Sequence, residues 1–253
     1  MKAFLLPLVL FLIPGAALAQ VEVPAGTVLP VTLHGSLSTT KSKPGDVVKA
    51  RVMQDIPLGK GSKIRAGSYV EGKVISVTPG SNGNPARITF QFNRLVTSKG
   101  SIPIATNLRA LASTLEVTSA QIPQYDDRGS SSYVNNTRQI GGEAVYRGGG
   151  HVMDGQTVVG EPVNDEDVIG RLRANPEGNC RGAVDGNDRP QALWLFSSDA
   201  CGVYGYRHLR IEHAGRTNPI GEITLSAERG EINIRGGSAM LLRVNSPSEA
   251  NGT

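Results

Sequence analysis

The sequence predicts an all-β protein: a barrel or sandwich of short antiparallel strands, with a long Gly/Ser-rich insertion and at most one or two short helices. Three observations predict this fold class. One turn-and-strand pattern occurs three times, short alternating segments are separated by turn residues, and the composition favours turns. The 253 residues include 31 Gly and 15 Pro, and only 5% are aromatic. The core is therefore expected to consist mainly of Val, Ile and Leu.

The first nineteen residues have the features of a cleavable signal peptide. Lys2 precedes the apolar stretch 3–13, and Ala17-Leu18-Ala19 forms a small-residue cleavage site before Gln20. The alternative is an uncleaved anchor, but the apolar stretch is shorter than the ~20 residues that span a bilayer. No later segment approaches that length, so we expect an exported mature chain, periplasmic or extracellular, with no transmembrane segment.

The repeated pattern consists of an apolar residue, any residue, a small residue, Gly, Ser or Thr, any residue, and a second apolar residue. It occurs at Val23-Pro24-Ala25-Gly26-Thr27-Val28-Leu29, at Ile64-Arg65-Ala66-Gly67-Ser68-Tyr69-Val70 and at Ile234-Arg235-Gly236-Gly237-Ser238-Ala239-Met240. Gly adopts the positive φ that tight turns require, and Ser or Thr bonds local backbone groups. Each copy therefore predicts a turn followed by a strand.

The rest of the first half alternates turns with strands. Lys43-Pro44-Gly45-Asp46 predicts a turn before a strand over 47–53, and a second strand is predicted over 70–77. Ile88, Phe90 and Phe92 fall on one face of a third strand.

Residues 112–165 are polar and Gly-rich with weak periodicity, which predicts a flexible insertion. Asn164 to Ala174 is predicted as a short helix capped by Asn164. Ala192 to Phe196 is a short apolar run that favours a buried strand, and Ile223–Leu225 with Ile232–Ile234 is predicted as a hairpin around Glu228-Arg229-Gly230.

The predicted organisation has five parts. They are the signal peptide (1–19), the first part of the barrel (20–111), the insertion (112–165), a disulfide-containing segment with the closing strands (166–245) and a polar tail (246–253).

The two cysteines, Cys180 and Cys201, predict one disulfide in an exported chain. The alternatives are a metal pair or a reactive thiol, with His208 or His213 as the base beside Cys201. The spacing of the two cysteines matches no zinc motif. The four histidines form no H-E-x-x-H motif, and no G-x-S-x-G sequence is present. We therefore expect no enzyme activity, no metal and no cofactor.

Exposed aromatic residues are the usual sign of a carbohydrate site. Tyr204 and Tyr206 lie beside Cys201, and His208 and His213 follow closely, so these four residues are the candidate ligand-binding residues. Half-buried rim positions are the alternative interpretation of the tyrosines. The net charge of +4 is modest and scattered along the chain, which favours a solvated surface over the clustered basic surface of a nucleic-acid binder, so we expect no nucleic-acid partner.

The order of Val23-Pro24-Ala25-Gly26-Thr27, Lys43-Pro44-Gly45-Asp46, Ile64-Arg65-Ala66-Gly67-Ser68 and Ala86-Arg87-Ile88-Thr89-Phe90 resembles the TrbI/TraB-like C-terminal β-barrel of type IV secretion and conjugal-transfer channel subunits. Met240-Leu241-Leu242-Arg243-Val244 resembles its final strand. The resemblance covers about residues 22–111 and 220–245. It implies the barrel fold more than the channel role, because the chain has a signal peptide where those subunits have a cytoplasmic segment, a membrane helix and a Pro-rich linker.

The sequence thus predicts a non-enzymatic structural or interaction module of the cell envelope, a secreted stand-alone version of that barrel. Its candidate partners are further copies of itself or envelope proteins. The alternative is a secreted carbohydrate- or cell-wall-binding module with a glycan as ligand.

Overall fold

The fold is seen in a computed structural model, which describes residues 23–59, 61–81, 83–121, 139–141, 143–145, 152–154, 157–162, 169–172, 195–197, 200–214, 216 and 218–245. The predicted signal peptide, the polar tail and Cys180 lie outside these ranges. Among the helices of the described ranges, none combines the length and the apolar character needed to cross a membrane.

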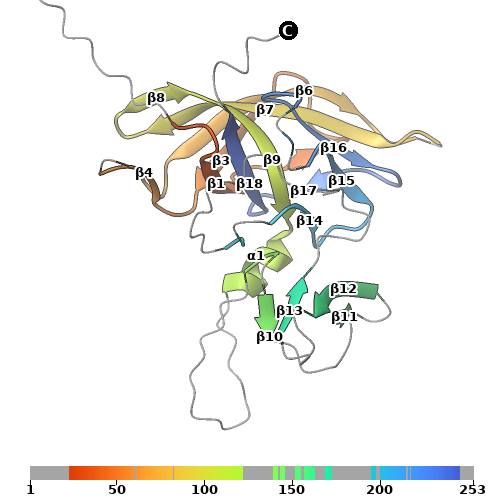
Figure 1. The fold of residues 1–253 in the computed structure, drawn as a ribbon. Coiled ribbons are helices and arrows are strands. Elements are labelled where there is room, and N and C mark those ends of the chain that lie inside the picture. The colour runs from red at the N-terminus through yellow and green to blue at the C-terminus, as the bar shows by residue number, and fades with distance from the viewer. Residues whose placement is uncertain are drawn as a thin grey trace, which may run out of the picture.

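A mixed ten-stranded sheet forms most of the described structure (Figure 1). Its strands are β1 (Val28–Leu33), β3 (Val47–Val52), β6 (Tyr69–Thr78), β7 (Ala86–Thr97), β8 (Gly100–Pro103), β9 (Ala105–Ala112), β14 (Gly202–Tyr204), β15 (Leu209–Glu212), β16 (Ile223–Ala227) and β18 (Ala239–Asn245). The order is β14-β9-β18-β1-β3-β6-β7-β16-β15, with β8 paired to β7. Every pairing is antiparallel except that of β14 with β9. The predicted all-β class is confirmed.

The large sheet curls but does not close. Its end strands β14 and β15 follow each other in the chain, joined by residues 205–208, yet no ladder between them occurs among the described strand pairs. The fold is therefore barrel-like and open between these two strands.

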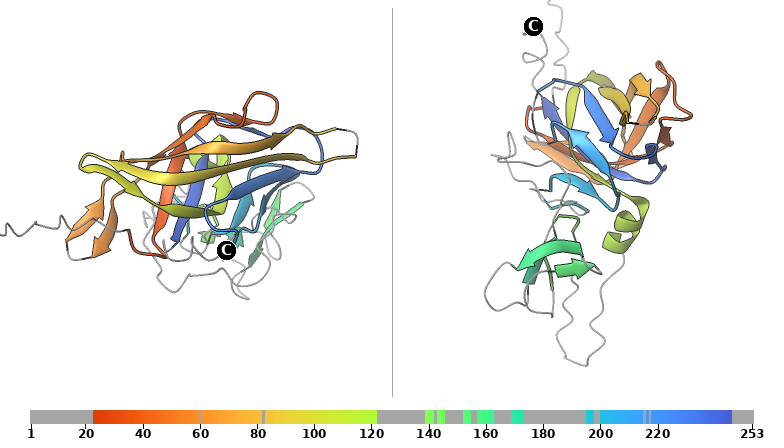
Figure 2. Two further views of the ribbon diagram at one scale, coloured as in Figure 1. Left: turned by 90° about the horizontal axis from the view of Figure 1, so that it is seen from above. Right: turned by 90° about the vertical axis from the view of Figure 1, so that its right-hand side faces the viewer.

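Smaller elements surround the large sheet. They are the pair β2 (Leu37–Ser38) and β17 (Asn233–Ile234), the pair β4 (Ile56–Gly59) and β5 (Ser62–Ile64), the helix α1 (Thr114–Gln121), and a sheet of β10 (Glu143–Val145), β13 (Ile169–Leu172), β12 (Thr157–Pro162) and β11 (Val152–Asp154). Figure 2 shows this four-stranded sheet (green) on the same side of the large sheet as α1.

The core lies inside the curl. Ile88, Phe90 and Phe92 have no exposed surface, as their alternation predicts, and the two rings meet edge to face with centroids 5.8 Å apart. A second apolar cluster lies on the other side of β9 and β18, where small residues let α1 approach closely. It includes Ala110, Ala112, Val117, Ala120, Phe196, Ala239 and Leu241.

The predicted turn at 43–46 and the three repeats share one hydrogen-bond arrangement. Gly26, Gly45, Gly67 and Gly237 have φ of 82°, 93°, 85° and 90°. Their N–H groups donate to the carbonyls of Val244, Val74, Val52 and Leu33 at 2.8, 2.9, 2.8 and 2.8 Å. In return, the N–H groups of Val244, Val74, Val52 and Leu33 donate to the carbonyls of the residues that follow the four glycines, which are Thr27, Asp46, Ser68 and Ser238. The turns therefore fix the register of two strand pairs, β1 with β18 and β3 with β6.

Two predictions of local structure are wrong. Residues 169–172 form strand β13 rather than part of a helix over 164–174, and the rest of that range lies outside the described residues. β16 pairs with β7 and β15, while β17 pairs with β2, so Glu228-Arg229-Gly230 does not connect a hairpin.

The range predicted as an insertion contains regular structure. The helix α1 begins at Thr114, and β10, β11 and β12 follow within 112–165. The flexibility of this range stays a prediction.

Candidate functional site

The two tyrosines near Cys201 occupy different environments. Tyr204 is the last residue of β14 and is 7% exposed. Its hydroxyl donates to the carbonyl of Cys201 at 3.2 Å, and it accepts from the N–H of Cys201 at 3.3 Å. Tyr204 therefore ties the loop at Cys201 to the end of its own strand.

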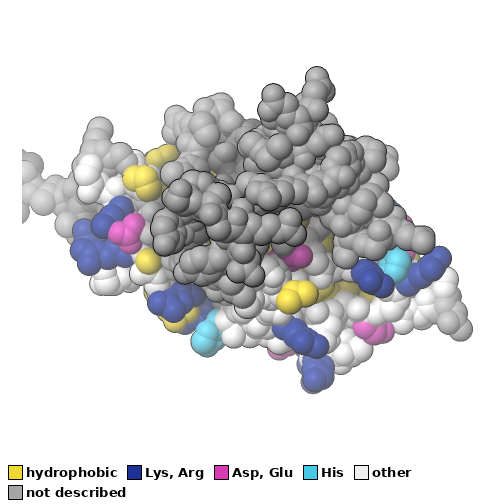
Figure 3. Space-filling view, turned by 90° about the horizontal axis from the view of Figure 1, so that it is seen from below, with side chains coloured by type: hydrophobic (Ala, Val, Ile, Leu, Met, Phe, Trp, Pro, Cys, Tyr) yellow, Lys and Arg dark blue, Asp and Glu magenta, His cyan; other side chains and the backbone are white. Residues whose placement is uncertain are grey.

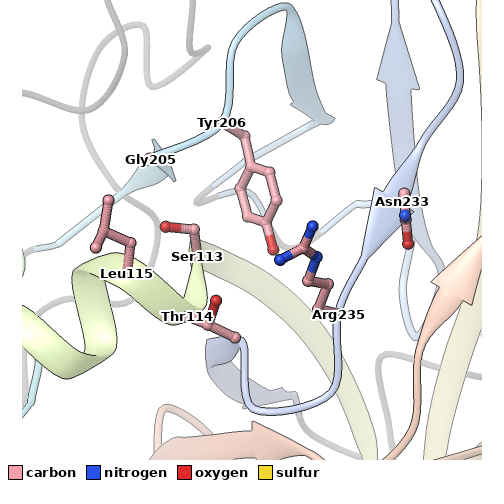
Figure 4. Close-up of a pocket in the computed structure, with 7 residues that line it drawn as sticks. All are labelled: Ser113, Thr114, Leu115, Gly205, Tyr206, Asn233 and Arg235. Atoms are coloured by element: carbon pink, nitrogen blue, oxygen red, sulfur yellow. The ribbon is translucent and has the colours of Figure 1, made fainter.

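Tyr206 is half-buried and lies beside a hollow of about 290 Å³ at one end of the large sheet (Figure 4). The hollow is lined by Ser113, Thr114, Leu115, Gly205, Tyr206, Asn233 and Arg235. These residues come from the start of α1, the segment after β14 and the region from β17 to the turn before β18.

Three strand ends place these residues together. Ala112 at the end of β9 pairs with Ala239 at the start of β18 and with Tyr204 at the end of β14. The N–H of Ser113 donates to the carbonyl of Tyr204 at 3.0 Å, which joins the start of α1 to the end of β14. The site is thus built where well-paired strands end, so its backbone is firmly held.

Gly205 is required for this approach. Its φ is +72°, and a Cβ at this position would lie 2.3 Å from Ser113 Oγ and 2.7 Å from Glu116 Cγ. A residue with a side chain would therefore be strained by this φ and would displace the side chains of Ser113 and Glu116 at the start of α1.

The Tyr206 hydroxyl is oriented by a buried partner. It lies 2.7 Å from Ser238 Oγ, and Ser238 has no exposed surface. Burial raises the pKa of Tyr206 above its ordinary value of 10.0, while the Ser238 hydrogen bond and the positive Arg235 act in the opposite direction. The phenol is therefore neutral at physiological pH.

His208 and His213 do not join the hollow's lining. Both are exposed, both have φ of 60°, and they lie in turns at opposite ends of β15. Histidine adopts this left-handed conformation more readily than most residues, so the two positions are turn positions. Whether any of the four residues predicted from the sequence binds a ligand stays a prediction.

Cys201 is 7% exposed and belongs to the apolar core. Cys180 lies outside the described residues, so the Cys180–Cys201 disulfide stays a prediction. Among the described residues, no three or more His, Cys, Asp or Glu side chains are grouped in a way that could hold a metal ion.

Sequence reasoning did not single out the residues that face Tyr206 across the hollow. Arg235 is part of the third repeat, which predicted its turn but not its neighbour Tyr206. Ser113 and Glu116 have the spacing of a helix-capping box, and the Glu116 N–H does donate to Ser113 Oγ at 3.3 Å. That signal would have found α1.

The described chain is thus a mostly β protein with an open, curled sheet and a polar hollow at one end of it. No protein-family model matches the chain, and no curated protein matches it. Among solved structures, it is partly similar to ComB10 of the Com type IV secretion system of Helicobacter pylori, with 26% sequence identity and a TM-score of 0.26. The match covers 32% of this chain and 41% of that chain.

Proposed function

We propose that the protein is an exported, non-enzymatic β module that assembles with copies of itself or with other envelope proteins. The signal peptide predicted from the sequence supports export, and the resemblance of its turn motifs to the TrbI/TraB-like barrel supports an envelope role. The observation that carries the assembly role is the set of edges at which the large sheet has no further strand among the described residues.

Three strands of that sheet have one hydrogen-bonded neighbour each among the described strands. β8 pairs with β7, β14 pairs with β9, and β15 pairs with β16. A strand edge with unpaired backbone groups is a template for a strand of another chain. β14 is buried along its length and β15 has no exposed residue, whereas Gly100, Ser101 and Pro103 of β8 are exposed, which makes β8 the most accessible of the three edges.

The outer edge of β8 offers one backbone donor. The Ile104 N–H donates to the Asn93 carbonyl at 3.1 Å, and bonded pairs alternate along an antiparallel ladder. The residues opposite Arg94 and Val96, which are Pro103 and Ser101, therefore direct their backbone groups away from β7. Because Pro103 has no N–H, Ser101 supplies the donor that a docking strand would use.

The test is the molar mass of the mature chain, measured by size-exclusion chromatography with light scattering over a wide concentration range. We expect the unmodified protein to assemble as concentration rises. Ser101→Pro removes the outward N–H and shifts the protein toward the monomer, with an unchanged circular dichroism spectrum showing that it folds.

Ser101→Ala is the matched control, because it keeps the backbone N–H and is expected to assemble like the unmodified protein. A mature chain that stays monomeric at every concentration, and that brings down no envelope protein from cross-linked cells, would refute the proposed function. Mass spectrometry of the exported product tests cleavage after Ala19, because an intact N-terminus would remove the support for export.

A further inference from the structure

The hollow beside Tyr206 is not needed for assembly through β8. It brings together an aromatic ring, a guanidinium group and an exposed aliphatic side chain from three separate segments (Figure 4). Leu115 is 71% exposed, whereas the large apolar side chains of the described ranges are mostly buried. An exposed leucine at the rim of a polar hollow is an apolar contact point for a ligand.

The helix end at the hollow is already capped by its own residues. The Glu116 N–H is bonded to Ser113 Oγ at 3.3 Å, and the Val117 N–H to the Ser113 carbonyl at 3.0 Å. Recognition at this site therefore rests on the side chains that line it rather than on the helix terminus.

Arg235 supplies the charge. It is exposed, and none of the salt bridges within the described part of the chain pairs Arg235 with a carboxylate. A guanidinium group is a planar fork of donors that matches a carboxylate in a bidentate way. Asn233, exposed two residues earlier, adds an amide with both donor and acceptor capacity.

The remaining lining selects between ligands that carry a carboxylate. Ser113 and Thr114 are hydroxyl residues, and five of the seven lining residues are polar. Such a lining suits a ligand with hydroxyl groups around its ring better than the apolar side chains of a peptide. The Tyr206 ring and Leu115 would contact the C–H faces of a sugar.

We propose that this hollow binds an acidic sugar residue of a polysaccharide, with Arg235 on the carboxylate and Tyr206 on the ring. A volume of about 290 Å³ is at the lower end of small-ligand pockets, which fits one sugar residue of a longer chain. The full chain carries a formal net charge of +4, and loss of Lys2 with the predicted signal peptide still leaves a positive mature chain, which favours approach to an acidic polymer. On the face seen in Figure 3 the Lys and Arg side chains form several separate groups, so overall charge alone gives no single binding site.

The test is affinity electrophoresis of the mature chain through native gels that contain polygalacturonate, its fully methyl-esterified form or dextran. We expect retardation by polygalacturonate only, because esterification removes the carboxylate and dextran never had one. Arg235→Gln is expected to weaken binding about tenfold, through loss of charge-assisted hydrogen bonds. Leu115→Ser is expected to weaken it several-fold without unfolding the protein, because Leu115 is exposed.

Arg229→Gln is the matched control. Arg229 is also exposed and its substitution removes the same charge, but it does not line the hollow. Equal weakening by Arg229→Gln and Arg235→Gln would show non-specific attraction and overturn the proposal. Unchanged binding by Arg235→Gln, or equal retardation in all three gels, would overturn it as well. These outcomes test sugar binding alone, because assembly is tested separately by the molar mass of each protein in light scattering.

Discussion

Gly72 on β6 provides the sharpest test of the packing between β6 and β7. A Cβ at this position would lie 1.8 Å from the carbonyl oxygen of Gln91, 2.6 Å from its carbonyl carbon and 2.8 Å from the Cα of Phe92. All three are backbone atoms of β7, so no side-chain rotation relieves the contact. The register of the two strands shifts between Glu71 and Gly72, which is where a bulge brings the backbones together.

Gly72→Ala must therefore push β7 away from β6. These two strands contact each other more extensively than any other pair of elements in the described fold. Overpacking in a well-packed core costs about 1–3 kcal/mol, and a contact with backbone places this substitution at about 3 kcal/mol. For a chain of this size, each kcal/mol lowers the melting temperature by about 2–4 °C. We expect Gly72→Ala to melt roughly 6–12 °C below the unmodified protein.

Two other glycines show whether steric overlap or backbone strain causes the lower melting temperature. Gly35 has no atom within 4 Å of its ideal Cβ, so Gly35→Ala is expected to melt like the unmodified protein. Gly45 also has open space but a φ of +93°, so Gly45→Ala isolates backbone strain of about 1–2 kcal/mol. Differential scanning calorimetry of the three variants measures the series. A Gly72→Ala protein that melts with Gly35→Ala would refute the close approach of β6 and β7.

Four further predictions concern single groups. Hydrogen bonds from two basic neighbours hold the pKa of Glu71 below its ordinary 4.5, so the free energy of unfolding should fall as pH drops through the folded-state pKa, and less so in Glu71→Gln. Asn107→Ala removes a hydrogen bond to the carbonyl of exposed Pro219 and leaves the buried Asn245 amide without its acceptor, which should cost about 1–3 kcal/mol in urea unfolding. Tyr204→Phe should cost about 1 kcal/mol and leave polygalacturonate binding unchanged. Thiol titration should find no free thiol before reduction and two afterwards if Cys180 and Cys201 are bonded.

The turns were the most predictable part of the fold. A Gly followed by Asp, Ser or Thr signals a local conformation with positive φ, and the signal needs no knowledge of distant residues. Gly26, Gly45, Gly67 and Gly237 all have that conformation. Strand β7 was predictable for a similar reason, since one face of the strand is buried and the alternation of Ile88, Phe90 and Phe92 is regular.

Pairing between distant strands was not predictable. Ile223–Leu225 and Ile232–Ile234 are close in sequence and have a turn between them, which favoured a hairpin. In the structure β16 instead fills the position beside β7, and β17 pairs with β2, almost two hundred residues earlier. Long-range partners decide such pairings, and no local pattern records them.

The hollow beside Tyr206 also depends on contacts between distant segments, but one of its turns was predictable from the sequence. Tyr206 and Arg235 are separated in sequence, and no residue next to either one indicates that the two side chains lie close together. They meet because the third repeat places Arg235 and Ser238 in the turn that precedes β18, where Ser238 bonds the Tyr206 hydroxyl at 2.7 Å. The turn that fixes the register of β1 and β18 therefore also positions the site. A predicted turn that carries an exposed charged residue and a buried hydroxyl is thus a place to look for binding, because its backbone is held by both strands that it joins.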